Sequence, residues 1–439
     1  MASRPLRRQL DLLRHASSFR LLFSAALGSG IGTWLATIAL TVDVYDKTHS
    51  ASWVSALMIA AFVPTIFVGL ALGSMVDRLS RWGLMISADV VRCGIFLALP
   101  FIDSALVIVA LAGLAGFANA FFRPAVLAGV PNLVADEDVT AANALLVSSE
   151  YAAISIGPIA GGALVAAFGT APAYWLNAAT FLLSAALIAR IPRTELQSEQ
   201  SLSRGHLRDI RDGVAVVVGS RPLLTVLAAM NIIVIAQAFI NVSEIVLAKV
   251  SFHSGSLGFG LLWTGSGIGL IAGSVLCERL VERFGVRRVY PWSLVVFAAG
   301  IGAAAISPNV WVAAVFMVVS GLGNGPVVVS NITLVQRGAP DRVRGRAFTL
   351  IMSTNFVVLG SALAVAGPLT DAFGARVLYG VSAGALVIAA VVAHLLIRGV
   401  GVGDVDEEGV SDALTNVELL PLPAGEAAVG DAPAELTRD

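Results

Sequence analysis

The chain alternates between long apolar runs and short polar connections. Each run is close to the roughly 20 residues that an α-helix needs to cross a bilayer, and each connection holds glycine, proline, asparagine, aspartate or charge, as turns do. The pattern predicts an all-α membrane protein with twelve transmembrane helices. We expect them at 20–43, 53–76, 83–101, 104–122, 142–167, 173–190, 222–247, 257–280, 289–306, 310–334, 347–368 and 376–397.

Composition supports a membrane protein and excludes several functional classes. The 439 residues are 57% hydrophobic and 13% charged, whereas soluble domains are roughly 25% charged. A net charge of −1 without a long basic block gives nucleic acid nothing to bind. Cys93 and Cys277 stand alone, so we expect no disulfide, no metal and no other cofactor. The sequence has no nucleotide-binding loop or catalytic triad, so it does not predict an enzyme.

The distribution of basic residues predicts the orientation. If the N-terminus is inside and the number of spans is even, nearly all arginines near helix ends lie in the cytoplasm, and only Lys47, Lys249 and Arg376 lie outside. This asymmetry follows the positive-inside rule. The first apolar run has no small-residue cleavage site and continues to spanning length, so we read it as an uncleaved helix. We therefore expect a multi-pass plasma-membrane protein with both termini cytoplasmic.

A charged loop occurs twice in the chain. Residues 69–84 contain the pattern G-x-x-x-D-R-x-x-R, with Asp77, Arg78 and Arg81 between two apolar runs, and Glu282 begins a similar pattern 205 residues after Asp77. Two motifs in register at one offset predict a duplicated unit, and hence two pseudo-symmetric six-helix bundles with substrate between them. The expected parts are a cytoplasmic N-terminus (1–19), an N-terminal bundle (20–190), a cytoplasmic linker (191–221) with a short amphipathic helix near 206–218, a C-terminal bundle (222–398) and a disordered acidic cytoplasmic tail (399–439).

The first charged loop resembles the signature loop between helices 2 and 3 of major facilitator superfamily transporters. Further motifs resemble the drug:proton antiporter branch, which includes macrolide and tetracycline efflux pumps and enterobactin-type siderophore exporters. They lie at 19–22, 38–40, 44–46, 88–92, 119–125, 143–144 and 157–162, and the similarity covers about residues 18–398. Only the G-P-x-x-G-G core of the helix-5 antiporter signature is present, at 157–162. The resemblance implies the major facilitator fold and a proton-driven exporter in a bacterial plasma membrane.

The resemblance also implies a cytoplasmic gate made by the two charged loops. Its candidate residues are Asp77, Arg78, Arg81, Glu282, Arg283 and Arg287. Asp77 could accept hydrogen bonds from the positive N-terminal end of a neighbouring helix, which we expect to be the eleventh, and so lock the outward-facing state. The alternative is a static clamp that does not switch.

Ionisable side chains inside a span are costly and are candidates for proton coupling. Asp89 and Arg92 are three residues apart on one helix, so they form either a structural ion pair or a coupling pair. Glu150 shares a helix face with glycines and is either a buried proton carrier or a side chain that reaches water. Asp43 is charged where the related antiporters usually have an apolar residue. Glu244 is the strongest candidate for contact with a proton or a cationic substrate.

Polar side chains at helical spacing are candidates for lining a substrate cavity. Gln237, Asn241 and Glu244 form one stripe, and Asn324 and Asn331 form another, with Asn119 as the repeat partner of Asn324. Trp34, Thr37 and Thr41 share a face of the first span. Helix–helix packing and hydrogen bonding would explain the same residues without a ligand. Gly157–Pro158 and Gly367–Pro368, in corresponding helices, are candidate bends.

The leading functional hypothesis is export of a small amphipathic compound by alternating access in exchange for protons. The compound would be a drug, an antibiotic or a siderophore, so multidrug efflux and antibiotic resistance are the expected biological context. One alternative in the same fold is transport of lysophospholipid or another lipid. An alternative of another class is a membrane sensor or scaffold that uses the acidic tail. We expect substrate, protons and membrane lipid as partners, and a monomer.

Overall fold

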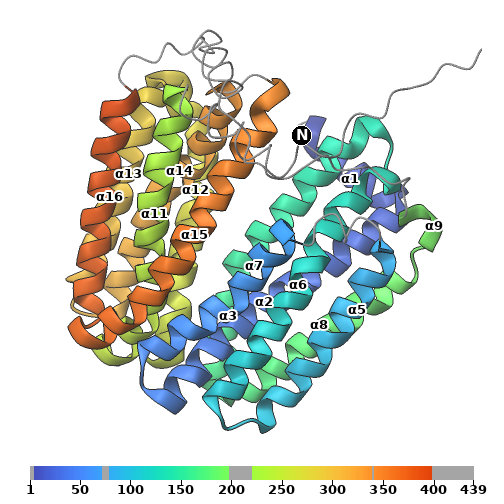
Figure 1. Ribbon diagram of the computed structural model, residues 1–439, viewed down its shortest axis with the longest axis horizontal. Coiled ribbons are helices and arrows are strands. Elements are labelled where there is room, and N and C mark those ends of the chain that lie inside the picture. The colour runs from blue at the N-terminus through green and yellow to red at the C-terminus, as the bar shows by residue number, and fades with distance from the viewer. Residues whose placement is uncertain (1–3, 72–78, 197–219, 339–340, 398–439) are drawn as a thin grey trace, which may run out of the picture.

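The computed structural model describes residues 4–71, 79–196, 220–338 and 341–397, and every regular element in these ranges is a helix (Figure 1). The long helices are α2 (Ser17–Thr48), α3 (Ala51–Ala71), α5 (Arg81–Ala98), α6 (Ala105–Leu133), α7 (Val139–Phe168), α8 (Thr170–Ala189), α11 (Arg221–Val246), α12 (Gly255–Phe284), α13 (Val286–Ala305), α14 (Val310–Gly338), α15 (Asp341–Phe373) and α16 (Ala375–Ile397). The short elements are α1 (Arg4–His15), α9 (Arg193–Leu196), the 3₁₀ helices η1 (Leu99–Phe101) and η2 (Asp136–Asp138), and the π-helix η3 (Leu247–Ser251).

Eleven helices in the described ranges are long and apolar enough to cross a membrane. The start of α3, Ala51–Pro64, is a shorter apolar stretch. Large apolar side chains such as Val275 (72% exposed) and Val357 (66% exposed) point outward, which suits contact with lipid rather than water. These helices confirm an all-α multi-pass membrane protein.

Several helices extend past their predicted ends. The fourth predicted span stops at residue 122, before Pro124, but α6 continues through Pro124 and Pro131 to Leu133. Proline is tolerated inside membrane helices because neighbouring groups satisfy the backbone carbonyl that it frees. The polar ends of α15 are likewise helical beyond the apolar run that predicted it.

The helices pack in two sets that we call the N-group (α1–α9) and the C-group (α11–α16). In the N-group, α2 packs on α7 and α8, α3 on α6, and α5 on α6 and α8; in the C-group, α12 packs on α14, α13 on α14 and α16, and α11 on α15 and α16. Figure 1 shows the N-group in blue to green and the C-group in yellow-green to red. Two helix pairs, α7 with α12 and α3 with α15, make most of the contact between the groups.

The two ends of the molecule differ. We call the end where α2 turns into α3 the His49 end, and the end where α5 begins the Arg81 end. His49 and His253 follow α2 and η3, and they are the described non-glycine residues with positive φ, at 50° and 51°. The two residues are 204 positions apart, one fewer than the offset between the charged loops. In Figure 1 the two groups converge at the His49 end.

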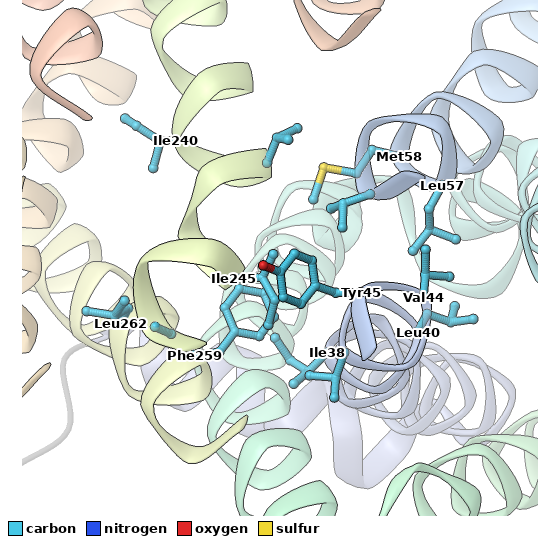
Figure 2. Close-up of a cluster of buried hydrophobic side chains, with 14 of the residues drawn as sticks. Ile38, Leu40, Val44, Tyr45, Leu57, Met58, Ile240, Ile245, Phe259 and Leu262 are labelled. Atoms are coloured by element: carbon cyan, nitrogen blue, oxygen red, sulfur yellow. The ribbon is translucent and has the colours of Figure 1, made fainter. Parts of the chain in front are cut away.

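The hydrophobic cores follow the same division. One cluster contains residues of both groups, and Figure 2 shows Tyr45 and Ile38 of α2 against Phe259 of α12, with Ile245 of α11 close by. The other two clusters each lie within one group, the N-group from Leu12 to Leu196 and the C-group from Leu223 to Ile397. Among the described side chains, the groups therefore share a core toward the His49 end, and each cluster toward the Arg81 end lies within one group.

Candidate functional site

A carboxylate of the C-group caps a helix of the N-group. Asp371, near the end of α15, accepts hydrogen bonds from the backbone N–H of Ala51 at 2.6 Å and of Ser52 at 3.0 Å. It also accepts from the hydroxyls of Ser50 at 2.8 Å and Ser52 at 2.6 Å. These residues begin α3, and the free N–H groups and partial positive charge of a helix start favour an anion there. Asp371 therefore joins the groups at the His49 end.

Two further cross-group contacts lie close to this cap. Lys249, on the π-helix η3, forms an ion pair with Asp46 of α2. Gly367, one turn before Asp371, packs so closely on α3 that a Cβ atom there would lie 2.5 Å from the Cα of Ser52. The two groups are thus joined at the His49 end by a helix cap, an ion pair and a close backbone approach.

The second interface, α7 with α12, depends on small residues and aromatic packing. A Cβ atom on Gly162 would lie 2.9 Å from the Cα of Gly260, and one on Gly260 would lie 2.8 Å from the carbonyl oxygen of Pro158. Nearer the middle of the helices, the rings of Trp34 on α2 and Trp263 on α12 lie 5.5 Å apart. Close approach through glycine is typical of helix packing in membranes.

The predicted helix-bend residues have packing roles. Pro158 and Pro368 both lie inside continuous helices. A Cβ atom on Gly157 would lie 2.5 Å from the Cβ of Trp34, so this glycine brings α7 against α2. Gly367 serves the same purpose between α15 and α3. Whether these positions flex during transport stays a prediction.

The predicted gate is only partly visible. Asp77 and Arg78 lie outside the described residues. Arg81 donates to the carbonyl oxygens of Ala128 at 2.9 Å and Leu196 at 3.4 Å, both within the N-group. In the second loop, three exposed residues lie where α12 gives way to α13, and the guanidinium of one, Arg283, lies 5.3 Å from the ring of Phe284. These are Glu282, Arg283 and Arg287.

Asp89 and Arg92 form the ion pair that their spacing predicts. Arg92 Nη2 lies 2.6 Å from Asp89 Oδ1, and the side chains are 4% and 0% exposed. Arg92 also donates to Asn119 Oδ1 at 3.0 Å. Its guanidinium lies 4.6 Å from the ring of Phe122 and 4.3 Å from that of Phe181. The cluster lies among α5, α6 and α8, inside the N-group. The amide oxygen of Asn119 therefore serves as a hydrogen-bond acceptor for Arg92 within this cluster.

Asp43 is buried and satisfied. Its Oδ1 lies 2.8 Å from Lys47 Nζ, one turn along α2. Its Oδ2 accepts a hydrogen bond from the hydroxyl of Tyr174 at 2.9 Å. Lys47 also donates to the carbonyl oxygen of Ile102 at 3.0 Å. The charge of Asp43 is therefore neutralised by Lys47 within the N-group.

The interpretation of Glu150 as a buried proton carrier is wrong. Both of its carboxylate oxygens bind Arg123, at 3.0 and 3.1 Å, and the side chains of Glu150 and Arg123 are 46% and 64% exposed. Glu150 lies in the first half of α7, nearer the Arg81 end, where the groups have separate cores. The alternative, a side chain that reaches open surface, is the one that the structure favours.

Glu244 is isolated in the interior of the C-group. The residue is 2% exposed, and its Oε1 has no hydrogen-bond partner among the described residues. The hydroxyl of Tyr379 on α16 is also buried without such a partner, and the two groups lie within electrostatic range of each other. Gln237 and Asn241 bind each other at 3.0 Å and are half-buried. The predicted polar stripe therefore does not continue to Glu244 as an open surface.

Several other candidates for lining a cavity form hydrogen bonds within their own helix group. The hydroxyls of Thr37 and Thr41 each donate to the carbonyl oxygen four residues earlier, at 2.8 Å. Asn331 accepts a hydrogen bond from Tyr290 at 2.6 Å. Asn324 is half-buried. On the same face of α2, Trp34 contacts Trp263 of the C-group.

Sequence reasoning missed the three charged residues that join the groups. Asp46, Lys249 and Asp371 lie at helix ends, where charge is ordinary, and no local spacing relates them. The Ser-Ala-Ser start of α3 at residues 50–52 signals a helix N-terminus, but it does not indicate that the cap comes from another helix. For the second interface, the small residues of α7 and α12 were a signal in the sequence that could have predicted close packing of these helices.

These features define the class: a multi-pass membrane protein with two helix groups joined at one end. The profile of the family described as transmembrane secretion effector matches residues 10–413. The chain belongs to this family of major facilitator transporters, as its resemblance predicted, and it is a transporter rather than an enzyme.

The chain is also similar in sequence to proteins that are described as exporters. The multidrug efflux pump Tap of Mycobacterium tuberculosis is 26% identical over 377 residues, covering 81% of this chain and 88% of Tap. The enterobactin exporter EntS of Salmonella paratyphi A is 27% identical over 367 residues, covering 81% of this chain and 86% of EntS.

Solved structures agree on the fold. A bacterial homologue of the iron transporter ferroportin, in an inward-facing state, superposes with a TM-score of 0.71 at 18% identity, covering 88% of this chain and 99% of that one. A bacterial homologue of the lysosomal transporter Spinster, inward-facing and unoccupied, gives a TM-score of 0.67 at 14% identity, covering 87% and 97%.

Proposed function

We propose that the protein is a secondary transporter of a bacterial plasma membrane that exports a small amphipathic compound in exchange for protons by alternating access. The N-group and C-group are the two six-helix halves, within residues 20–190 and 222–398, and together they cross the bilayer twelve times. Both termini are cytoplasmic, which makes the Arg81 end cytoplasmic and the His49 end external. This orientation rests on the positive-inside distribution of arginines.

The distribution of hydrophobic cores is the observation that carries the proposal. An alternating-access transporter closes one end while the other end is open, and its halves rock about a site near the midplane. A core shared at the His49 end, with separate cores at the Arg81 end, supports a state closed to the outside and accessible from the cytoplasm. The inward-facing states of the ferroportin and Spinster homologues support the same assignment.

The antiparallel pair α3 and α15 supplies a gate at each end. At the His49 end, Asp371 of α15 caps the start of α3. At the Arg81 end, Asp77 follows α3 in the chain and would cap the start of α15 when that end closes. Arg78, Arg81 and the second charged loop at Glu282, Arg283 and Arg287 would complete that gate.

The substrate class follows from the relatives. Tap is described as a multidrug efflux pump and EntS as an enterobactin exporter, and these descriptions support a drug, an antibiotic or a siderophore as the exported compound. Trp34 and Trp263 offer an aromatic surface between the halves that suits an amphipathic molecule. The half-buried amides of Gln237 and Asn241 would supply polar contacts.

A transport assay in proteoliposomes tests the proposal. The full chain is reconstituted and a pH gradient is imposed in the presence of a macrolide, a tetracycline or a catecholate siderophore. We expect the gradient to accelerate flux of at least one of these compounds, and Asp77→Asn to abolish that flux while the protein still inserts. The matched control is Asp103→Asn, at an exposed turn of the opposite end, which should transport normally.

The same preparation separates the alternatives. Flux of none of the compounds under any gradient, together with translocation of lysophospholipid, would replace this proposal with lipid transport. A chain that moves neither class of compound would contradict transport itself.

A further inference from the structure

We propose that Glu244, together with the hydroxyl of Tyr379, binds the proton that the transporter exchanges for its substrate, an assignment that rests on the proposed function. Each helix group contains a tyrosine at the equivalent place in the repeat and a buried acid on its first long helix, and the two acids are one helical turn out of register. The two sites differ in a way that makes only the one in the C-group available for reversible proton binding.

The tyrosines mark the equivalence. Tyr174 and Tyr379 are 205 residues apart, which is the offset of the charged loops, and each lies in the second turn of the last long helix of its group, α8 or α16. Each lies near an acid on the first long helix of the group, but only Tyr174 is hydrogen-bonded to it. Asp43 on α2 accepts a hydrogen bond from Tyr174 at 2.9 Å, and Glu244 on α11 lies one turn before the position equivalent to Asp43.

The two acids have opposite surroundings. Asp43 has a permanent counter-ion in Lys47 at 2.8 Å, four residues along the same helix. Four residues after Glu244 the chain has Ala248, which is fully buried. Among the described residues, no lysine, arginine or histidine forms an ion pair with Glu244. The acid of the N-group is therefore neutralised by a lysine, and a bound proton would neutralise that of the C-group.

The charged side chains on the helices next to Glu244 interact with partners other than Glu244. On α16, Arg376 donates to the carbonyl oxygen of Ala305 at 3.1 Å. On α15, Asp371 is held by the start of α3. On η3, Lys249 pairs with Asp46 of α2. The remaining titratable groups at this level are on α2 and in the two turns: Asp43, Tyr45, Lys47, His49 and His253.

The two orphaned atoms complement each other. Glu244 Oε1 and the Tyr379 hydroxyl are both buried without a hydrogen-bond partner in the described part of the chain. Eleven buried side-chain atoms lack a partner among the described residues, and two of them belong to carboxylates, Asp89 and Glu244. Asp89 has Arg92 as its counter-ion, whereas Glu244 has none in the described part of the chain. A protonated carboxyl group and a phenol can each donate to the other, whereas a carboxylate can only accept. In the structure the two groups are not hydrogen-bonded to each other. A bound proton would neutralise the carboxylate and allow them to form that bond.

The location of the site links it to the external gate. Glu244 lies three residues before η3, the π-helical segment that carries Lys249 across to Asp46. Single π-helical turns in longer helices are frequently found at functional sites. When the His49 end opens, water can deliver a proton to the carboxylate, and closing of that end seals the neutral acid against α16. Proton binding and closure then favour each other.

Infrared difference spectroscopy tests the site without a substrate. Purified full-length protein in nanodiscs is titrated with acid and base, and we expect a carboxylic-acid C=O band that responds to pH. The band should disappear in Glu244→Gln, shift in Tyr379→Phe and persist in the matched controls Asp43→Asn and Tyr174→Phe. A wild-type spectrum without the band, or one that Glu244→Gln leaves unchanged, would overturn the assignment.

Transport measurements separate this inference from the proposed function. In proteoliposomes that contain the tetracycline, Glu244→Gln should lose acceleration by a pH gradient but keep exchange of internal for external tetracycline, and Asp43→Asn should keep both. A Glu244→Gln protein that still responds to the gradient contradicts the proton site alone. A wild type with the infrared band but no gradient-driven flux contradicts the proposed function and leaves the proton site standing.

Discussion

Asp371 and Ala51 are 320 residues apart in the chain, yet the carboxylate of one accepts the backbone N–H of the other at 2.6 Å. The contact joins the end of α15 to the start of α3 and so ties the two helix groups together at one end. It depends on elementary helix physics, because a helix start offers free N–H groups to any acceptor within reach. Weakening it should favour the state in which the His49 end is open.

Replacing Asp371 with alanine should shift the conformational equilibrium. Loss of a helix cap costs about 1 kcal/mol, which corresponds to roughly a fivefold change in the equilibrium between closed and open forms. The measurement is the distance between spin labels at Ser104 of the N-group and Pro308 of the C-group, both exposed at the His49 end. Asp103→Ala serves as control and should leave the distances unchanged. Identical distributions for Asp371→Ala and the wild type would show that the cap does not hold this end closed.

Lys249 and Lys47 allow a matched comparison of two ion pairs. Lys249 reaches from the C-group to Asp46 of the N-group, whereas Lys47 pairs with Asp43 inside the N-group. Lys249→Gln should lengthen the label distance between residues 104 and 308, because only this pair crosses the interface. Lys47→Gln should leave that distance as it is. Equal effects of the two substitutions would argue against a gating role for the cross-group pair.

Gly162 should be intolerant of even one additional methyl group. A Cβ atom there would lie 2.9 Å from both the Cα of Gly260 and the carbonyl oxygen of Ser256, so Gly162→Ala must push α7 and α12 apart. We expect reduced flux and less of the closed form in the spin-label measurement. Gly94→Ala is the control, because a Cβ atom on Gly94 meets nothing within 4 Å. Normal transport by Gly162→Ala would mean that the interface tolerates a wider spacing.

The Asp89–Arg92 cluster should matter for stability. Asp89→Asn leaves the buried guanidinium of Arg92 without its counter-ion, and breaking such a pair costs about 3–5 kcal/mol. Denaturant unfolding in detergent micelles measures this loss. Glu150→Gln, which breaks the exposed pair with Arg123, should cost only about 0.5 kcal/mol. Equal stability of the two variants would indicate that the buried pair carries little net energy.

The fold was predictable because each membrane span can be recognised from its own apolar run in the sequence. An apolar run of spanning length must be helical in lipid, because the α-helix is the conformation in which a single segment satisfies all its own backbone hydrogen bonds. The Asp89–Arg92 pair was predictable for a similar reason, because residues three apart on a helix are neighbours. Helix ends were less predictable, as α6 shows, since its two prolines did not end it.

The contacts between the groups could not be predicted in the same way. Asp371 meets Ala51 only because two helices far apart in the chain run antiparallel and side by side, and no local pattern records that pairing. The burial of Glu244 and the exposure of Glu150 also depend on neighbours from other helices. Helical spacing put Glu244 on a face with Gln237 and Asn241, but contact with α16 decided its environment.

Because Asp371 belongs to the other helix group, the proposed opening of the His49 end would remove the hydrogen-bond partner of the Ala51 amide. In the closed form this N–H is bonded and Ala51 is fully buried. In the open form the N–H would face water and exchange its hydrogen for deuterium. A single backbone amide, already present in the natural chain, would then report how often the transporter opens to the outside.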